Sequence, residues 1–208
     1  VHALAWTRAG VLERGVCENE GQLAWNDRPY EGVLDVDIEI PPCGRYESEL
    51  ALAARGWMRA LAAALERGAI LVIDYGFPAR EYFHPQRSMG TLACHYRHHM
   101  HGDPFYLPGL QDITAHVDFS ALARAANDAG LETLGFTTQA QFLVNCGITD
   151  ELAKENPEDA KRYLPAASAV QKLLSPSEMG ELFKVLALGK GVTTPLQGFG
   201  QGDRSAAL

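Results

Sequence analysis

Residues 70–76 read ILVIDYG, an apolar run that ends in an acid, an aromatic residue and a glycine. A short apolar run of this kind is typical of a buried strand in a parallel sheet. A helix is expected just before it, over 48–67, because apolar residues recur there at helical spacing and a glycine follows. A helix followed by a buried strand predicts an α/β fold. Ligands of such folds bind at the carboxyl ends of the strands, where Asp74, Tyr75 and Gly76 lie.

The rest of the chain divides into a strand-rich start, a long loop and a mixed second half. Residues 33–40 alternate apolar residues with acids, which predicts a strand with one solvated face. Residues 77–116 contain many prolines and little regular signal, and only 89–96 could form a strand. The other predicted strands are 1–7, 11–17, 23–25, 131–137 and 183–188; the other predicted helices are 119–129, 139–146, 150–155 and 156–174, with an S-x-x-E capping box at 175–178.

The composition is that of an ordinary globular protein, with 47% hydrophobic and 21% charged residues. The net charge of −8 argues against nucleic acid as the main partner, because phosphate binding needs clustered Lys and Arg. No apolar run approaches the roughly 18–20 residues of a membrane span. The cysteines are far apart and form no C-x-x-C pair, so they predict neither a zinc site nor a disulfide framework, and a cytoplasmic location is expected. They are Cys17, Cys43, Cys94 and Cys146.

Most histidines of the chain lie in residues 90–119, which read GTLACHYRHHMHGDPFYLPGLQDITAHVDF. Imidazole is the commonest metal ligand and a natural proton-transfer group near neutral pH. The run from His95 to His101, H-x-x-H-H-x-H, nevertheless matches no zinc signature, and no predicted helix presents it. We therefore expect His98 and its neighbours to line a polar cleft or to hold the loop in place by hydrogen bonds, with a metal-dependent hydrolase as the alternative.

A denser set of chemical groups follows, just before the predicted helix at 119–129. Asp112, Thr114 and His116 either face a substrate or form a self-bonded turn, and the residues alone leave both readings open. Asp118 is expected to cap the helix. No phosphate-cradling or nucleophile motif accompanies them: the sequence has no G-x-G-x-x-G, no G-x-x-x-x-G-K-[ST] and no G-x-S-x-G.

Several short motifs stand in a recognisable order along nearly the whole chain. With them the chain resembles the MidA-like S-adenosylmethionine-dependent methyltransferases, relatives of the mitochondrial arginine methyltransferase that assists complex I assembly. The motifs are GAILVIDYG at 68–76, GTL at 90–92, Tyr96, His98, Pro108-Gly109, DITAHVDF at 112–119, QAQFL at 139–143, Gly147-Ile148, Ser175-Pro176 and MGELFKV at 179–185.

The resemblance implies an α/β fold with the later strands of a class I methyltransferase Rossmann-like sheet. In that fold 69–73, 131–137 and 183–188 would be the fifth, sixth and seventh strands. The family's glycine-rich cofactor loop precedes these strands, and this sequence, which begins with Val1, shows none. We expect the carboxy-terminal part of a single methyltransferase domain over 1–208. Its expected parts are a β-hairpin insertion (1–40), a sheet core with a long acceptor-side loop (41–137 and 175–190), a helical insertion (138–174) and a loose tail (191–208).

The resemblance also implies an enzyme that methylates an arginine side chain of a protein with S-adenosyl-L-methionine. The cofactor pocket would lie mostly in sequence not present here, so the chain is expected to supply the acceptor side. Carboxylates would hold the guanidinium by charge-assisted hydrogen bonds, and nearby groups would position or deprotonate it. The catalytic candidates are Asp112, His116, Asp74 and Tyr75, and the substrate-binding candidates are Gly76, His98, Thr114, Glu47 and Glu49.

The expected partner is a protein substrate, by the resemblance a subunit of the respiratory complex I type. No metal ion is expected, and the oligomeric state is not indicated. A catalytically silent module that docks a partner protein through its loops is a second reading from a different class. The metal-dependent hydrolase that uses the histidine run is a third.

Overall fold

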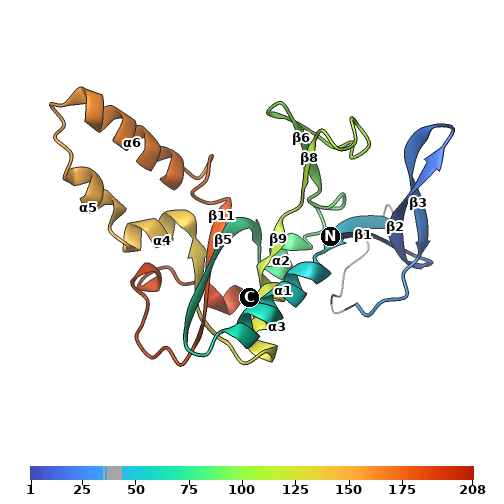
Figure 1. Cartoon of the computed structure of the whole chain (residues 1–208), viewed down its shortest axis with the longest axis horizontal. Helices are drawn as coiled ribbons and strands as arrows, with labels where there is room; N and C mark the ends of the chain where they lie inside the picture. The colour runs from blue at the N-terminus through green and yellow to red at the C-terminus, as the bar shows by residue number, and fades with distance from the viewer. Residues whose placement is uncertain (35, 37–43) are drawn as a thin grey trace. The chain divides into compact units, whose positions relative to one another are not determined.

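The computed structural model describes residues 1–34, 36 and 44–208. The chain forms two compact units, which we describe separately (Figure 1). The first unit comprises Val1–Ala54 and Arg80–His116, and the second comprises Arg55–Ala79 and Val117–Leu208. Each unit therefore combines two segments that are far apart in the sequence.

A four-stranded antiparallel sheet with the order β3-β2-β1-β4 forms much of the first unit. The predicted strand at 33–40 lies largely outside the described residues. Four side chains from β1 and β4 form the core of the sheet, namely Leu4, Trp6, Tyr46 and Leu50. The bounds are β1 His2–Thr7, β2 Gly10–Asn19, β3 Gln22–Pro29 and β4 Arg45–Leu50.

The strand β4 occupies the start of the helix that the sequence predicts at 48–67. That prediction was wrong at its amino-terminal end, because β4 pairs with β1 along its whole length and buries Tyr46, Ser48 and Leu50 on one face. The helix α1 begins only after this pairing ends and spans Leu52–Ala64.

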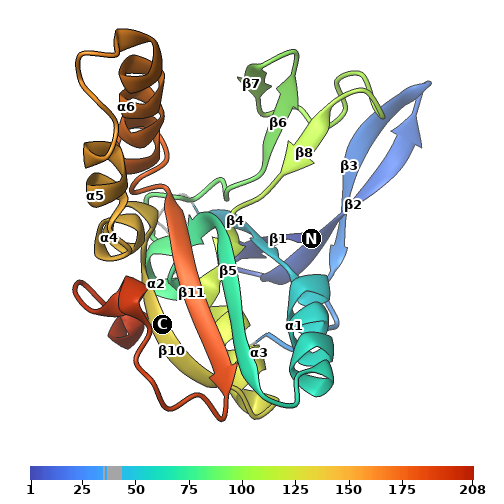
Figure 2. The same cartoon turned by 60° about the vertical axis from the view of Figure 1, so that its left-hand side comes forward.

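A small three-stranded sheet, with the order β7-β6-β8, carries the histidine-rich part of the first unit (Figure 2). The prediction of a strand within 89–96 is confirmed for β6, whereas β7 and β8 were not predicted. Arg97 and His98 have φ of 48° and 65° and form the turn between β6 and β7, since the favoured two-residue hairpin turn needs positive φ at both positions. The bounds are β6 Ala93–Tyr96, β7 His99–His101 and β8 Asp112–Thr114, with the short helix α2 at Ala79–Tyr82.

The second unit contains a sheet with the order β10-β11-β5-β9. The strand β11 lies between β5 and β10 and is antiparallel to both, while β9 is parallel to β5 at Gly76 and Phe77. The predictions of strands in 131–137 and 183–188 are confirmed. The bounds are β5 Gly68–Phe77, β9 Val117–Asp118, β10 Glu132–Thr138 and β11 Phe183–Lys190.

The strand β5 differs from the doubly buried parallel strand that its sequence predicts. Its burial alternates, and Leu71 and Ile73 are 47% and 49% exposed. Alternate side chains of a strand point to opposite faces, so the exposed Leu71 and Ile73 share one face of β5. Within the part of the chain that the structure describes, this face of β5 therefore remains open.

The helix α3, Phe119–Asp128, confirms the helix predicted at 119–129. Asp118 is its N-cap, because its Oδ1 accepts a hydrogen bond of 3.0 Å from the N–H of Ala121. Phe119 and Leu122 are buried, and the Phe119 ring lies 5.3 Å from that of Phe136 on β10.

Three further helices of the second unit confirm the helices predicted within 139–174 (Figure 1). The capping box predicted at 175–178 was wrong, because no helix follows it. The N–H groups of Glu178 and Gly180 instead both donate to the carbonyl of Ser175 in a compact turn. No helix in the described ranges is long and apolar enough to cross a membrane. The bounds are α4 Gln139–Asn145, α5 Ile148–Ala153 and α6 Ala160–Leu174.

The tail at 191–208, predicted to be loosely held, is instead bound along the edge of β10. The N–H of Arg204 donates to the carbonyl of Phe136 at 2.6 Å, and the N–H of Phe136 donates to Asp203 Oδ1 at 2.9 Å. Phe199 packs against Val185 in a second apolar cluster. The tail thus satisfies backbone groups that an edge strand would otherwise expose.

We predict that Asp203→Ala loosens this attachment at neutral pH but not in acid. Burial alone would raise the pKa of the Asp203 carboxyl, but hydrogen bonds from Phe136 and Ser205 outweigh it and hold that pKa below its usual range. A lowered pKa gives stability that is present above the unfolded value of about 4 and is lost as the pH falls through the folded value. The residue is exposed, so we expect a loss of only about 1 kcal/mol at pH 7.

Urea unfolding at pH 7 and at pH 3 measures this effect, with Asp128→Ala on α3 as the matched exposed control. A loss of stability that is equal at both pH values would contradict the assignment.

Candidate functional site

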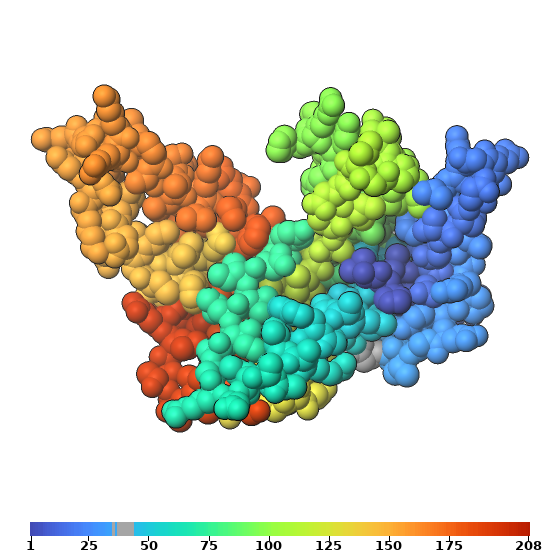
Figure 3. All heavy atoms as spheres, in the orientation of Figure 1, coloured from blue at the N-terminus to red at the C-terminus, as the bar shows by residue number. Residues whose placement is uncertain are grey.

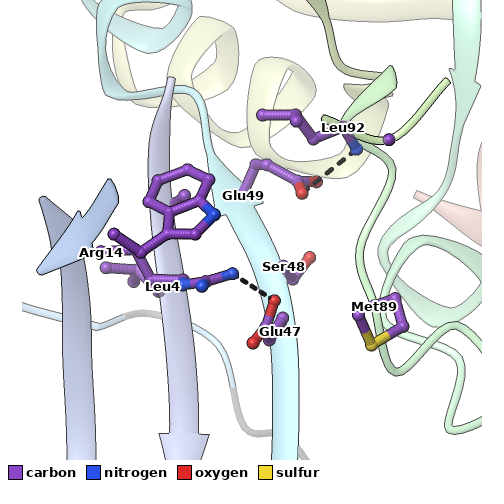
Figure 4. A pocket seen from close by; sticks show the side chains of 10 residues that line it. Leu4, Arg14, Glu47, Ser48, Glu49, Met89 and Leu92 are labelled. Carbon is purple, nitrogen blue, oxygen red and sulfur yellow. Dashed lines mark hydrogen bonds and ion pairs between the residues drawn. The ribbon is translucent and has the colours of Figure 1, made fainter. Parts of the chain in front are cut away.

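Glu49, near the end of β4, is a buried carboxylate that is only 4% exposed. Its Oε2 accepts hydrogen bonds from the N–H and the hydroxyl of Thr91, at 2.9 and 2.8 Å. Its Oε1 accepts the N–H of Leu92 at 3.2 Å, the contact drawn in Figure 4. The Tyr82 hydroxyl adds a longer hydrogen bond of 3.4 Å to Oε2. A buried charge needs such partners, so Glu49 fixes Thr91 and Leu92, within the loop at 77–116, to the sheet.

Gly90 makes this approach possible. Its φ is +74°, and a Cβ added there would lie 2.2 Å from Glu49 Oε1. Any other side chain would therefore both strain the backbone and collide with the carboxylate. Of the GTL motif at 90–92, each residue thus has a physical role: Gly90 gives room, while Thr91 and Leu92 donate.

Thr91 extends the network to His116. The N–H of His116 donates to Thr91 Oγ1 at 3.0 Å, while the same hydroxyl donates to Glu49. One threonine hydroxyl therefore connects a carboxylate on β4 with the backbone of the last residue of the first unit. Sequence reasoning named Glu49 and His116 separately but missed Thr91, although its place inside a family motif was an available signal.

Asp112 and Thr114 lie on β8, next to this network in the sequence. They form a strand rather than the self-bonded turn that was one reading of the sequence. Asp112 is exposed and lies opposite His95 on β6, and the Thr114 hydroxyl donates to the carbonyl of Ala93 at 3.3 Å. Opposite residues of paired strands share a face, so the Asp112 and His95 side chains point to the same side of the small sheet.

Glu47 belongs to a closed ring of alternating charges. Its carboxylate accepts from Arg14 at 2.5 Å and from Arg45 at 2.7 Å, and both arginines also donate to Asp27, at 3.3 and 2.8 Å. Hydrogen bonds to Asp27 and Glu47 raise the pKa of Arg45. Burial alone would raise the pKa of Asp27, but the hydrogen bonds from Arg45 and Arg14 outweigh it and lower that pKa. The Arg14 guanidinium also lies 4.2 Å from the ring centre of Trp25.

A pocket of about 370 Å³ opens between these two groups of side chains (Figure 4). Ser48 in its wall is 1% exposed, and its hydroxyl has no hydrogen-bond partner among the described residues. Glu47 and Glu49 also line the pocket, but their oxygens are engaged as above. A cation that entered would therefore have to displace Arg14 from Glu47. The remaining lining residues are Ala3, Leu4, Arg14, Trp25, Met89, Leu92 and Gly102.

The candidates at the end of β5 are engaged with neighbouring backbone in the second unit. Asp74 Oδ1 accepts the N–H of Tyr75 at 2.8 Å, and the Tyr75 ring lies 5.7 Å from Phe183. A Cβ on Gly76 would lie 2.2 Å from the carbonyl oxygen of Val117, so this glycine permits the close pairing of β5 with β9.

Lys184 is a buried residue near these candidates that sequence reasoning missed. It is 4% exposed and lies opposite Asp74 in the register of β11 and β5. Its Nζ lies 5.5 Å from the ring centre of Phe77. Its ammonium donates to the carbonyls of Glu181 and Leu182. The signal available was a lysine inside an otherwise apolar run, FKVLAL.

The histidine run does not gather into a metal site in the described ranges, where no three His, Cys, Asp or Glu side chains lie together as ligands. His98 and His99 are exposed, and the His101 ring packs edge-on against Tyr106 at 5.3 Å. The observed positions of these side chains give the hydrolase reading no support.

The predicted site residues divide between the two units. Asp74, Tyr75 and Gly76 belong to the second unit. In the first unit, Glu49 and His116 belong to one hydrogen-bond network, and Glu47 lies in the wall of the same pocket as Glu49. The other candidates of the first unit, outside these contacts, are His98, Asp112 and Thr114.

Comparison with known proteins identifies the family of the chain. A family model described as "Putative S-adenosyl-L-methionine-dependent methyltransferase" matches residues 1–137. The mitochondrial protein arginine methyltransferase NDUFAF7 of Mus musculus is 37% identical over 125 residues, which is 58% of this chain and 26% of that protein. The NDUFAF7 of Homo sapiens is 36% identical over 129 residues, which is 60% of this chain and 27% of that protein.

Two solved structures from Burkholderia thailandensis are similar over nearly the whole chain. One is 49% identical, with a TM-score of 0.93. The match covers 99% of this chain and 56% of that structure's chain. The other is described as a "likely methyl transferase" bound to S-adenosyl-homocysteine and is 50% identical, with a TM-score of 0.91. The match covers 100% of this chain and 54% of that structure's chain. The chain thus spans about a quarter of the curated relatives it matches and about half of these structures.

We predict that Glu49→Gln lowers the free energy of unfolding by about 2 kcal/mol. The amide NH₂ of the glutamine would face a backbone N–H that now donates a hydrogen bond to the carboxylate, so two donors would meet. Urea unfolding measures the change, with Glu20→Gln in the exposed turn between β2 and β3 as the control. A loss of less than about 0.5 kcal/mol would show that the carboxylate is not holding the loop.

Gly90→Ala is predicted to destabilise the protein more than Gly109→Ala. Both glycines have positive φ, at +74° and +82°, but a Cβ at Gly109 would meet nothing within 4 Å. The control therefore measures backbone strain alone, about 1 kcal/mol, and Gly90→Ala adds the collision with Glu49. Equal melting temperatures for the two variants would refute the close approach of Gly90 to Glu49.

Proposed function

We propose a function from one premise: the chain belongs to the family of S-adenosyl-L-methionine-dependent methyltransferases. The complete protein methylates an arginine side chain of a partner protein, and residues 1–208 supply the acceptor side of its site. The observation that carries the proposal is the likeness of the whole chain to the Burkholderia thailandensis structure bound to S-adenosyl-homocysteine. The arginine acceptor follows from the names of the curated relatives.

The strand order of the second unit supports this proposal. The resemblance to class I methyltransferases makes β5, β10 and β11 the fifth, sixth and seventh strands of their Rossmann-like sheet. In the structure β11 lies between the other two and is antiparallel to both. We accordingly assign 41–137 and 175–190 to the sheet core, 1–40 to a hairpin insertion and 138–174 to a helical insertion.

The residues present do not by themselves fit the cofactor. The sequence has no G-x-G-x-x-G motif, and its glycine-rich stretch at 198–202 follows β11 and is bonded to β10, where the Thr137 hydroxyl donates to the carbonyl of Gly202. At the end of β5, the Asp74 carboxylate is engaged by the N–H of Tyr75, and the space beside Gly76 is filled by the Val117 backbone. We therefore assign no S-adenosyl-L-methionine contact to a residue of this chain.

The acceptor side has two tasks, to hold a nitrogen in line for transfer and to remove its proton. In the proposal Asp112 and His116 do this work, because a carboxylate and an imidazole are suited to bind and deprotonate a guanidinium. The Thr91 hydroxyl fixes the backbone of His116, which limits where its side chain can reach. The ring of Arg14, Asp27, Arg45 and Glu47 supports the wall of the neighbouring pocket.

The partner belongs to the proposal as well. We propose a protein substrate, by resemblance a subunit of the respiratory complex I type. The curated relatives are named as mitochondrial proteins, and the cytoplasmic location predicted from the cysteines stays a prediction.

Transfer of a radiolabelled methyl group by the complete natural polypeptide tests this function. We predict that Asp112→Asn and His116→Ala each lower kcat about 100-fold while the melting temperature stays the same, because positioned acid–base groups contribute on that order. Asp128→Asn is the control.

Near-normal turnover in a folded Asp112→Asn or His116→Ala variant would leave these residues a structural role. Failure of the wild-type polypeptide to bind S-adenosyl-L-methionine by calorimetry would favour the catalytically silent docking module instead.

A further inference from the structure

A second pocket of the first unit lies at the tip of the β2–β3 hairpin and shares no lining residue with the first pocket. Its volume is about 480 Å³, and we call it the hairpin-tip pocket. In Figure 3 the hairpin (blue) and the loop after β7 (yellow-green) lie next to each other. The lining residues are Gly21, Gln22, Leu23, Asp103, Phe105 and Pro108.

Both walls of the hairpin-tip pocket are built by local contacts. The turn between β2 and β3 has positive φ at Glu20 and Gly21, and the N–H of Gly21 donates to Glu18 Oε1 at 2.5 Å. In the loop, Asp103 Oδ1 accepts the N–H of Phe105 at 2.9 Å. The Phe105 ring packs edge-on against Trp25 of β3, with 5.1 Å between ring centres.

Apolar side chains surround this pocket without being covered. The register places Val16 opposite Trp25 and Glu18 opposite Leu23, so these four side chains share the face of the hairpin that meets the loop. Val16 and Leu23 are 55% and 42% exposed, and Leu110 at the far side of the loop is 69% exposed. Exposed apolar side chains that gather around a pocket mark a surface for a partner.

The charged side chains of the two walls are acidic, and the neighbouring Arg14, which lies over Trp25 on the same face of the hairpin, is paired with Asp27 and Glu47. Glu18, Glu20 and Asp103 are exposed acids. Residues 15–24 and 98–116, which supply both walls, contain no Lys or Arg. This contrasts with the ring around Glu47, where two arginines neutralise two acids. The surface therefore attracts cations and repels nucleic acid, anionic lipid and a second copy of this chain, whose net charge is −8.

We propose that the hairpin-tip pocket docks a basic segment of the protein substrate, with an apolar side chain of that segment between Leu23 and Phe105. Lys or Arg residues beside this anchor lie against Glu18 and Asp103. That the partner is the enzyme's substrate rests on the proposed function. It adds a binding surface that selects the substrate by the residues around the acceptor rather than by the acceptor itself.

Fluorescence anisotropy with two labelled peptides tests the proposal on the complete natural polypeptide. Both peptides carry the same leucines, and one carries arginines where the other carries glutamates. We predict that the basic peptide binds and the acidic one does not. Glu18→Lys with Leu23→Ser should weaken binding of the basic peptide at least about tenfold, because it reverses a charge and removes an apolar wall.

The matched control is Glu151→Lys with Leu164→Ser, the same two exchanges at exposed positions on α5 and α6, which should leave binding unchanged. Equal binding of both peptides, an unchanged affinity in the hairpin variant, or a dimer that this variant dissociates would each overturn the proposal.

The assay needs neither cofactor nor turnover, so its outcome is separate from that of the proposed function. Peptide binding without methyl transfer supports the docking surface and refutes the proposed methyltransferase activity. If the hairpin variant transfers methyl groups with an unchanged KM for the protein substrate, the docking surface is refuted and the proposed methyltransferase activity is supported.

Discussion

The first unit depends on one buried charge. Glu49 is an ionisable side chain in the interior, and such a group is tolerated only when donors surround it. The chain supplies those donors from Thr91 and Leu92, and Gly90 supplies the space that lets them approach. The loop at 77–116 is thus fixed to β4 at Thr91 and Leu92, just before the strands β6, β7 and β8.

The motif DITAHVDF acquires a physical meaning from this arrangement. It begins as β8 in the first unit, passes through His116, and continues as β9 and the start of α3 in the second unit. A side chain fixes the backbone on each side of the passage: Thr91 accepts from His116, and Asp118 accepts from Ala121. The same few residues therefore end one unit, begin the other and carry the groups proposed for acceptor chemistry.

The sequence predicted the elements whose signals are local. The helix α3 has a cap at Asp118 and an apolar stripe, and β11 is an apolar run of strand length, so both were found. β4 was missed because its pairing with β1 joins residues that are far apart in the sequence, so no local signal marks it. The attachment of the tail was missed because it depends on Asp203 and Phe136, which approach only in the folded chain. In the candidate site, Glu49 and His116 were found by type, but their link through Thr91 is a tertiary contact that no spacing reveals.

The hydrogen bond between Thr91 and Glu49, on which their link to His116 depends, is open to a direct measurement. A double-mutant cycle of Glu49→Gln and Thr91→Val, followed by urea unfolding, gives the coupling free energy between the two side chains. The network predicts a coupling of about 1–2 kcal/mol, because each substitution already removes the hydrogen bond that the other would break. Additive losses within about 0.3 kcal/mol would contradict it and leave Glu49 and Thr91 as independent contributors to stability.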